Sequence, residues 1–166
     1  MEINISNLSD GEHRFDFEEP ADEFDIDWLD KDKKVIVDVV LYKMANQFNL
    51  DIEVKSGVIF ECDRCMENYK TDLLTEFDLI YKYEFSGESQ IETNEDNLKF
   101  ITPNTHKINL KEDVRDYIIL SAPMKKVPPE EDGICTYCKK NINEITQTDH
   151  EEKSNPIWDE LKKLKK

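Results

Sequence analysis

Residues 48–54, FNLDIEV, alternate strictly between apolar and polar side chains. Because successive side chains of a strand point to opposite faces, the apolar residues of this stretch would share one face and the polar residues the other. This is the pattern of a half-buried β-strand. We predict that the strand continues through SGVIFEC (56–62), after a bulge or turn at Gly57.

Neighbouring stretches carry similar signals. VIVDVVLYKM (35–44) is rich in β-branched residues, and residues 73–85 alternate over a long run. Hairpins between such neighbours would give an antiparallel sheet. Two further short strands are predicted at INISNL (3–8) and HRFDFE (13–18), and the acidic stretch 18–32 is predicted to be largely irregular.

One helix is predicted over residues 110–121. Asn109 can cap it, Glu112 stands three residues further on as in a capping box, and Pro123 ends it. A second, short helix is predicted within NPIWDELKKLKK (155–166). The fold class is therefore α+β: an antiparallel curved sheet or partly open β-barrel with one packed helix, and a C-terminal segment with a short helix.

A length of 166 residues suits one domain with a small appendage. We predict a β-rich core domain over 1–123, with an acidic and partly irregular start of about 30 residues, a linker over 124–134, and a metal-tethered C-terminal segment over 135–166. The chain has neither a long apolar run nor a basic, apolar leader, so we expect a cytoplasmic protein without a membrane partner. Its thiols would then stay reduced.

The formal net charge is −16. An acidic body repels phosphate, which disfavours broad electrostatic binding to nucleic acid. A basic partner protein fits this charge better, although a run of acids taken alone is more often a solubilising surface.

The four cysteines form two identical C-x-x-C pairs, Cys62 with Cys65 and Cys135 with Cys138. Two such pairs can act as knuckles that supply the four thiolates of a tetrahedral site, which zinc most often fills. Closing a loop of about 70 residues costs roughly 4 kcal/mol. A structural zinc ion contributes about 10–16 kcal/mol in small peptides, enough to tie the pairs together. We predict one structural zinc ion per chain.

Other interpretations of the cysteines stay open. They could hold an iron–sulfur cluster, form a redox dithiol, or be unrelated buried residues. A redox dithiol usually lies at the start of a helix, and neither pair begins a convincing one. No deaminase pattern of histidine and glutamate and no glycine-rich phosphate loop accompanies them. We therefore expect no catalytic residues, no enzyme activity and no small-molecule substrate.

Four stretches together resemble a known family. They are FECDRCMENY (60–69), DVRDYIILSAPMKKVPPEEDG (113–133), GICTYCKKNIN (133–143) and NPIWDELKKL (155–164). In order and spacing they resemble the YceD family, called large ribosomal RNA subunit accumulation proteins. The resemblance implies a non-enzymatic ribosome-biogenesis factor needed for accumulation or processing of large-subunit ribosomal RNA. It also implies that the four cysteines are metal ligands.

The chain departs from the family pattern near its second cysteine pair. Many members have glycine after the last cysteine, where this chain has Lys139, and proline before it, where this chain has Thr136 or Tyr137. The tail of members usually contains D-P-R, where this chain has asparagine, proline and isoleucine at 155–157. These differences concern the tight turn of the second knuckle rather than its ligands.

We expect the direct partner to be a basic ribosomal or ribosome-assembly protein, with any contact to precursor large-subunit RNA local and secondary. The candidate partner-binding residues are Arg64, Lys125, Lys126, Lys139, Lys140 and Trp158. Two alternative functions remain: a thiol–disulfide oxidoreductase that uses one C-x-x-C pair, and an acidic chaperone of a basic protein.

Overall fold

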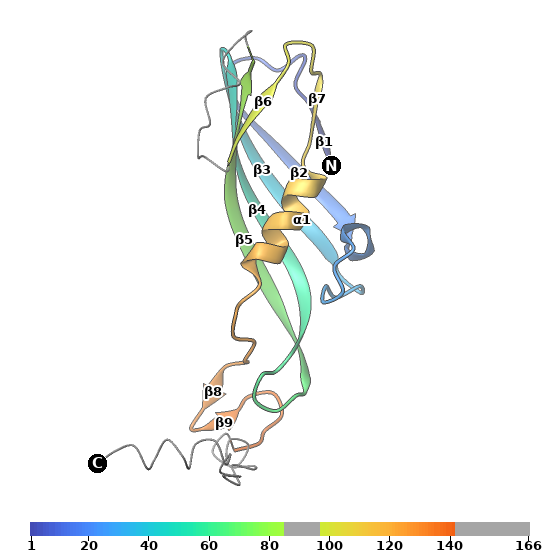
Figure 1. Cartoon of the computed structure of the whole chain (residues 1–166), viewed down its shortest axis with the longest axis vertical. Coiled ribbons are helices and arrows are strands. Elements are labelled where there is room, and N and C mark those ends of the chain that lie inside the picture. The colour runs from blue at the N-terminus through green and yellow to red at the C-terminus, as the bar shows by residue number, and fades with distance from the viewer. Residues whose placement is uncertain (85–96, 142–166) are drawn as a thin grey trace, which may run out of the picture. The chain divides into compact units, whose positions relative to one another are not determined.

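A computed structural model describes residues 1–84 and 97–141 (Figure 1). Its main element is a five-stranded sheet of order β2-β3-β4-β5-β6. The strands of this sheet are β2 (Gly11–Pro20), β3 (Lys34–Met44), β4 (Gln47–Glu61), β5 (Asn68–Tyr83) and β6 (Leu98–Ile101). The other elements are β1 (Glu2–Asn4), η1 (Ala21–Phe24), β7 (Lys107–Asn109), α1 (Lys111–Ser121), β8 (Glu130–Glu131) and β9 (Ile134–Cys135).

The chain divides into two compact units. The first unit comprises Met1–Phe60 and Lys70–Met124, and it contains α1 and nearly all of the sheet. The second unit comprises Glu61–Tyr69 and the chain from Lys125 onward, of which the structure describes residues up to 141. It contains β8 and β9, which pair antiparallel.

The sheet is open and mixed. β2 and β4 both pair antiparallel with β3, and β4 is joined to its neighbour β5 by residues 62–67, a connection that only antiparallel strands can use. β6 pairs parallel with β5, which the long connection between them allows. The two edge strands, β2 and β6, do not pair among the described residues, and the sheet is open and does not curl toward a barrel (Figure 1). The predicted antiparallel strands are thus confirmed for β2 to β4, and the barrel alternative is wrong.

The stretch that predicted the sheet lies in β4 as expected. Its apolar side chains are all buried, and its polar side chains are exposed or half-buried. The expected turn at Gly57 is wrong, because β4 runs through this residue to Glu61. A Cβ atom at Gly57 would lie 2.3 Å from Cδ of Lys33, so the glycine makes room for a crossing side chain.

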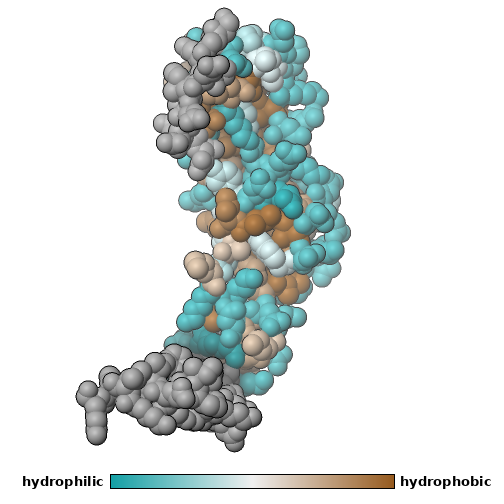
Figure 2. Space-filling model, in the orientation of Figure 1, coloured by the Kyte–Doolittle hydropathy of each residue, from teal (hydrophilic) through white to brown (hydrophobic). Residues whose placement is uncertain are grey.

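Helix α1 lies across one face of the sheet (Figure 1). Leu110, Val114 and Ile118 are fully buried, and the ring of Tyr117 stacks on Phe77 of β5 with centroids 3.9 Å apart. The N-cap is Leu110, which forms no side-chain cap bond, so the predicted cap at Asn109 is wrong. Asn109 Oδ1 still accepts a hydrogen bond from the Lys111 N–H at 3.0 Å, one residue before the cap position. Apolar side chains also gather on the exposed surface over α1 (Figure 2). The predicted C-terminal helix lies outside the described residues.

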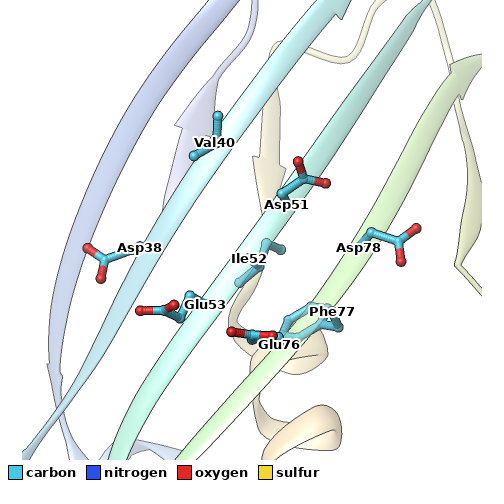
Figure 3. Close-up of a pocket in the computed structure, with 8 residues that line it drawn as sticks. All are labelled: Asp38, Val40, Asp51, Ile52, Glu53, Glu76, Phe77 and Asp78. Carbon is cyan, nitrogen blue, oxygen red and sulfur yellow. The ribbon is translucent and has the colours of Figure 1, made fainter.

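The opposite face of the sheet is acidic. Asp16, Asp38 and Glu53 are direct cross-strand partners on β2, β3 and β4, an arrangement of like charges that costs stability. Lys55 offsets part of this cost through ion pairs with Asp38 at 3.3 Å and Glu53 at 2.5 Å. Figure 3 shows further carboxylates of β4 and β5 on the same face. No helix in the described part of the chain has the length and apolar character needed to cross a membrane.

Asp30, which shortly precedes β3, has a buried carboxylate that is held by an ion pair. The Asp30 side chain is 4% exposed and forms an ion pair of 2.9 Å with Lys70, and its backbone N–H donates to the Gly57 carbonyl. The hydrogen bond from Lys70 lowers the pKa of Asp30 below its usual value near 3.8. This carboxylate therefore stabilises the fold in its charged form.

Truncation of a core side chain should test the buried face of β3. Leu41→Ala should lower the free energy of unfolding by about 2–5 kcal/mol, because Leu41 is fully buried and its loss leaves a cavity. Met44→Ala in the same strand should change it by less than about 0.5 kcal/mol, because Met44 is 47% exposed. Urea denaturation followed by circular dichroism measures both. Equal losses would contradict the assigned faces.

Removal of the Asp30 charge should have a pH-dependent effect. Because the folded pKa is lowered, the stabilisation is present above about pH 3.8 and is lost as the pH falls through the folded value. Asp30→Asn should therefore lower the melting temperature at neutral pH, and the difference from the parent protein should shrink below that pH. Asp32→Asn is the matched control, since Asp32 is 90% exposed and 3.7 Å from the same lysine. A difference that stays constant down to acid pH would refute this role.

Candidate metal centre

The two cysteine pairs lie in turns of the same hydrogen-bonding pattern, both within the second unit. In the first turn, the Cys62 N–H donates to the Glu67 carbonyl at 3.0 Å and the Met66 N–H donates to the Cys62 carbonyl at 2.9 Å. In the second turn, the Cys135 N–H donates to the Lys140 carbonyl at 3.0 Å, as the Cys62 N–H does to Glu67. The Lys139 N–H likewise donates to the Cys135 carbonyl at 3.0 Å. Residues 62–67 and 135–140 are therefore equivalent turns.

Each turn also has a left-handed residue directly after its second cysteine. Met66 has φ 57° and Lys139 has φ 59°, a region that costs a side chain about 1–2 kcal/mol. Lys139 is the position where the resembling family often has glycine. The second knuckle thus forms its tight turn with lysine, and the matching geometry of Met66 shows that the turn itself requires this conformation.

The turns bring the thiols together. The Sγ atoms of Cys62, Cys65 and Cys135 all lie within 4.8 Å of one another, and the thiol of Cys138 interacts with those of Cys65 and Cys135. In a tetrahedral zinc site with bonds of about 2.3 Å, sulfurs lie roughly 3.8 Å apart. The grouping predicted from the spacing of the cysteines is therefore present. All four residues are free cysteines.

The surroundings of the sulfurs suit thiolate ligands. Hydrogen bonds from backbone amides, first from the Cys138 N–H, hold the pKa of the Cys135 thiol below its usual range. Burial raises the pKa of the Cys65 thiol to about 11, and the backbone hydrogen bond with Glu67 partly opposes this increase. A positive ion is what would stabilise several thiolates in so buried a place. The donor set therefore fits a thiophilic metal.

Polar contacts join the two segments around the thiols. Asp63 and Lys126 are linked twice, by a backbone bond of 2.9 Å and by the Lys126 N–H donating to the Asp63 carboxylate at 2.6 Å. Arg64 binds the Glu130 carboxylate and donates to the Pro128 carbonyl at 3.2 Å. These contacts were not anticipated from the sequence, which offers no sign of them beyond proximity to the cysteines.

The candidate partner-binding residues occupy different environments. The Arg64 side chain is only 14% exposed and is bound within the unit. Lys140 forms an ion pair of 3.4 Å with Glu67, whereas Lys125 and Lys139 are exposed. Trp158 lies outside the described residues. Arg64 therefore acts as an internal contact of the unit.

The described geometry gives no support to a redox dithiol. Cys62 and Cys135 are fully buried, and Cys65 and Cys138 are half-buried with their thiols turned to the other pair. No helix begins at either pair among the elements that the structure describes. The arrangement is that of two knuckles around a common point.

A family model described as "Large ribosomal RNA subunit accumulation protein YceD" matches residues 50–165. The matched region includes both knuckles, β5 and α1. No curated protein and no solved structure matches the chain. Because the match covers more than half of the chain and agrees with the resemblance of the four stretches, the chain belongs to the YceD family of large ribosomal RNA subunit accumulation proteins.

Proposed function

We propose that the chain is a non-enzymatic assembly factor of the large ribosomal subunit, needed for accumulation or processing of its RNA. In this proposal the second unit is an interaction module held closed by one zinc ion. The observation that carries the metal role is the pair of equivalent turns with three Sγ atoms within 4.8 Å of one another. The family description supplies the link to the ribosome.

Cys62, Cys65, Cys135 and Cys138 would hold the zinc ion as a closed set of four thiolates, which leaves no position for substrate. The ion would then supply structural stability and no redox chemistry. Exposed Lys139 and the nearby Lys140 would offset part of the negative charge of the centre. Zinc is favoured over an iron–sulfur cluster because two short knuckles and a single meeting point suit a mononuclear site.

The partner in this proposal is a basic ribosomal or ribosome-assembly protein. A net charge of −16 opposes the approach of bare RNA, and the same charge attracts a basic protein surface. Of the described cations near the metal centre, Arg64 and Lys140 are already paired with carboxylates, whereas Lys125 and Lys139 are exposed. Contact with RNA would therefore be local.

Metal analysis should find one zinc ion per purified chain. Cys62→Ser should abolish the bound zinc and lower the melting temperature, because it removes a buried ligand. Lys139→Gly should keep the zinc, because glycine adopts the left-handed conformation without strain. Elemental mass spectrometry after dialysis and thermal denaturation with and without chelator measure these outcomes. Iron with visible absorbance, or metal-free protein with rapidly reacting thiols, would contradict the zinc assignment.

Affinity purification of the tagged full chain should recover basic proteins of the large-subunit assembly pathway. Their recovery should fall at high salt and survive nuclease treatment, because the attraction is between proteins. The chain should also co-sediment with precursor large subunits. Recovery of naked ribosomal RNA alone, with every partner lost after nuclease treatment, would show that the partner is RNA. Absence from precursor subunits would refute the ribosomal role.

A further inference from the structure

Among the residues that the structure describes, no strand pairs with one edge of β5 along most of its length. β6 occupies only the stretch from Ile80 to Tyr83, where the Ile80 N–H donates to the Asn97 carbonyl at 2.8 Å. Since the backbone groups of alternate residues point to the same side of a strand, those of Leu74, Glu76 and Asp78 point to this edge. Within residues 1–84 and 97–141, no backbone group bonds to them.

An apolar groove of about 480 Å³ runs beside this open edge. It lies between β5 and the C-terminal half of α1, and its exposed apolar side chains are Leu74 (54% exposed) and Leu120 (76% exposed), with Glu76 at its rim. Its floor is fixed by a hydrogen bond of 2.7 Å between the Thr75 and Ser121 hydroxyls. The groove belongs to the apolar surface over α1 seen in Figure 2.

The other side of the same edge is acidic. Glu76 and Asp78 stand on the face of β5 that Figure 3 shows, next to Asp51 and Glu53 of β4. These residues line a hollow of about 540 Å³. Among the described residues, no ion pair engages Asp51 or Glu76. An incoming strand at the edge would therefore meet Glu76 and Asp78, together with Leu74, on one face, and the apolar surface of α1 that includes Leu120 on the other.

We propose that the β5 edge from Leu74 to Asp78 binds an extended basic segment of a partner protein as an added strand. The edge would bond to the backbone of the segment, the groove would take its apolar side chains, and the carboxylates would attract its lysines or arginines. The recognised pattern is thus an alternation of basic and apolar residues. The basic character of the occupant rests on the proposed function as well as on the charge of this face.

Two alternatives are less favourable: a second copy of the chain at the β5 edge, and binding of the partner at the β2 edge. A second copy of the chain would bring Glu76 and Asp78 against the same acids of its partner, and like charges on neighbouring strands are destabilising. The other edge of the sheet, β2, has no large exposed apolar side chain among its ten residues, so it lacks the exposed leucines found at the β5 edge. The β5 edge combines open backbone, apolar surface and charge.

A titration of the full chain with a synthetic peptide tests the backbone part of the proposal. The probe is a peptide of about ten residues that alternates lysine and valine, and calorimetry measures its dissociation constant. The control peptide has the same sequence with methylated backbone nitrogens, which keeps the charge but removes the hydrogen-bond donors. We expect the control to bind at least about tenfold more weakly. Equal affinity would show that charge alone is recognised and would overturn the proposal.

Substitutions locate the binding site. Leu120→Asp should weaken binding of the lysine–valine peptide by about tenfold or more, because it places a charge in the apolar groove. Met44→Asp is the control of equal charge, since Met44 is an exposed apolar residue of β3 (47% exposed) that does not line the groove. It should change the affinity by less than about twofold. Equal effects of the two substitutions would overturn the assigned site.

Sedimentation experiments separate this inference from the proposed function. Leu120→Asp should co-sediment with precursor large subunits less than the parent chain does, while its zinc content stays unchanged. If both chains co-sediment equally, the edge is not the docking site and the ribosomal role still stands. If neither co-sediments, the ribosomal role fails, and the peptide titration still decides whether the edge binds basic strands. A concentration-dependent dimer of the parent chain that Leu120→Asp abolishes would assign the edge to a second copy and overturn the proposal.

Discussion

The described part of the second unit, residues 61–69 and 125–141, has almost no apolar core, and this constraint limits how that part can be stabilised. In its described part, the buried residues are Cys62, Tyr69, Pro128 and Cys135. So small a unit cannot be stabilised by apolar burial alone, and small units of this kind usually depend on a metal ion or cross-links. Half of the buried positions are cysteines whose sulfurs meet. The stability of the unit would therefore come mainly from the ion that we propose between them.

The proposed metal link between the two cysteine turns would also affect the stability of the first unit. The chain enters the second unit at Glu61, leaves it at Tyr69 and returns at Lys125. The segment between these points contains β5, β6, β7 and α1. A metal that joins residues 62–67 to residues 135–140 would close this segment into a loop in the unfolded chain and reduce its conformational entropy. The proposed metal could thus stabilise the first unit without contacting it.

Local pattern predicted much of the fold. The alternation of residues 48–54 and the helical spacing of Leu110, Val114 and Ile118 were enough to predict β4 and α1, because side-chain burial follows the local period of the sequence. The parallel pairing of β6 and the uninterrupted course of β4 through Gly57 were not predictable, since both depend on distant segments. Gly57 resembles a turn residue in the sequence, but its lack of a side chain serves the passage of Lys33.

The candidate site was predictable in its members and not in its detail. Equal spacing of the two cysteine pairs predicted that they would meet, because two knuckles can share one ion. The left-handed conformations of Met66 and Lys139 could not be predicted from the sequence, since neither residue is glycine. Arg64 illustrates a different limit. Its charge predicted an outward role, but Glu130 and the Pro128 carbonyl hold it inside the unit, and only the folded chain brings these groups beside it.

The row formed by Asp16, Asp38 and Glu53 ties the stability of the sheet to its ionic surroundings. Dissolved cations gather near such a row and reduce the repulsion between its carboxylates. A lysine-rich strand bound nearby would do the same and would release those cations to the solvent. The repulsion between these carboxylates, which destabilises the free protein, would thus become part of the driving force for association with the basic partner that we propose. That partner would act as a macromolecular counterion.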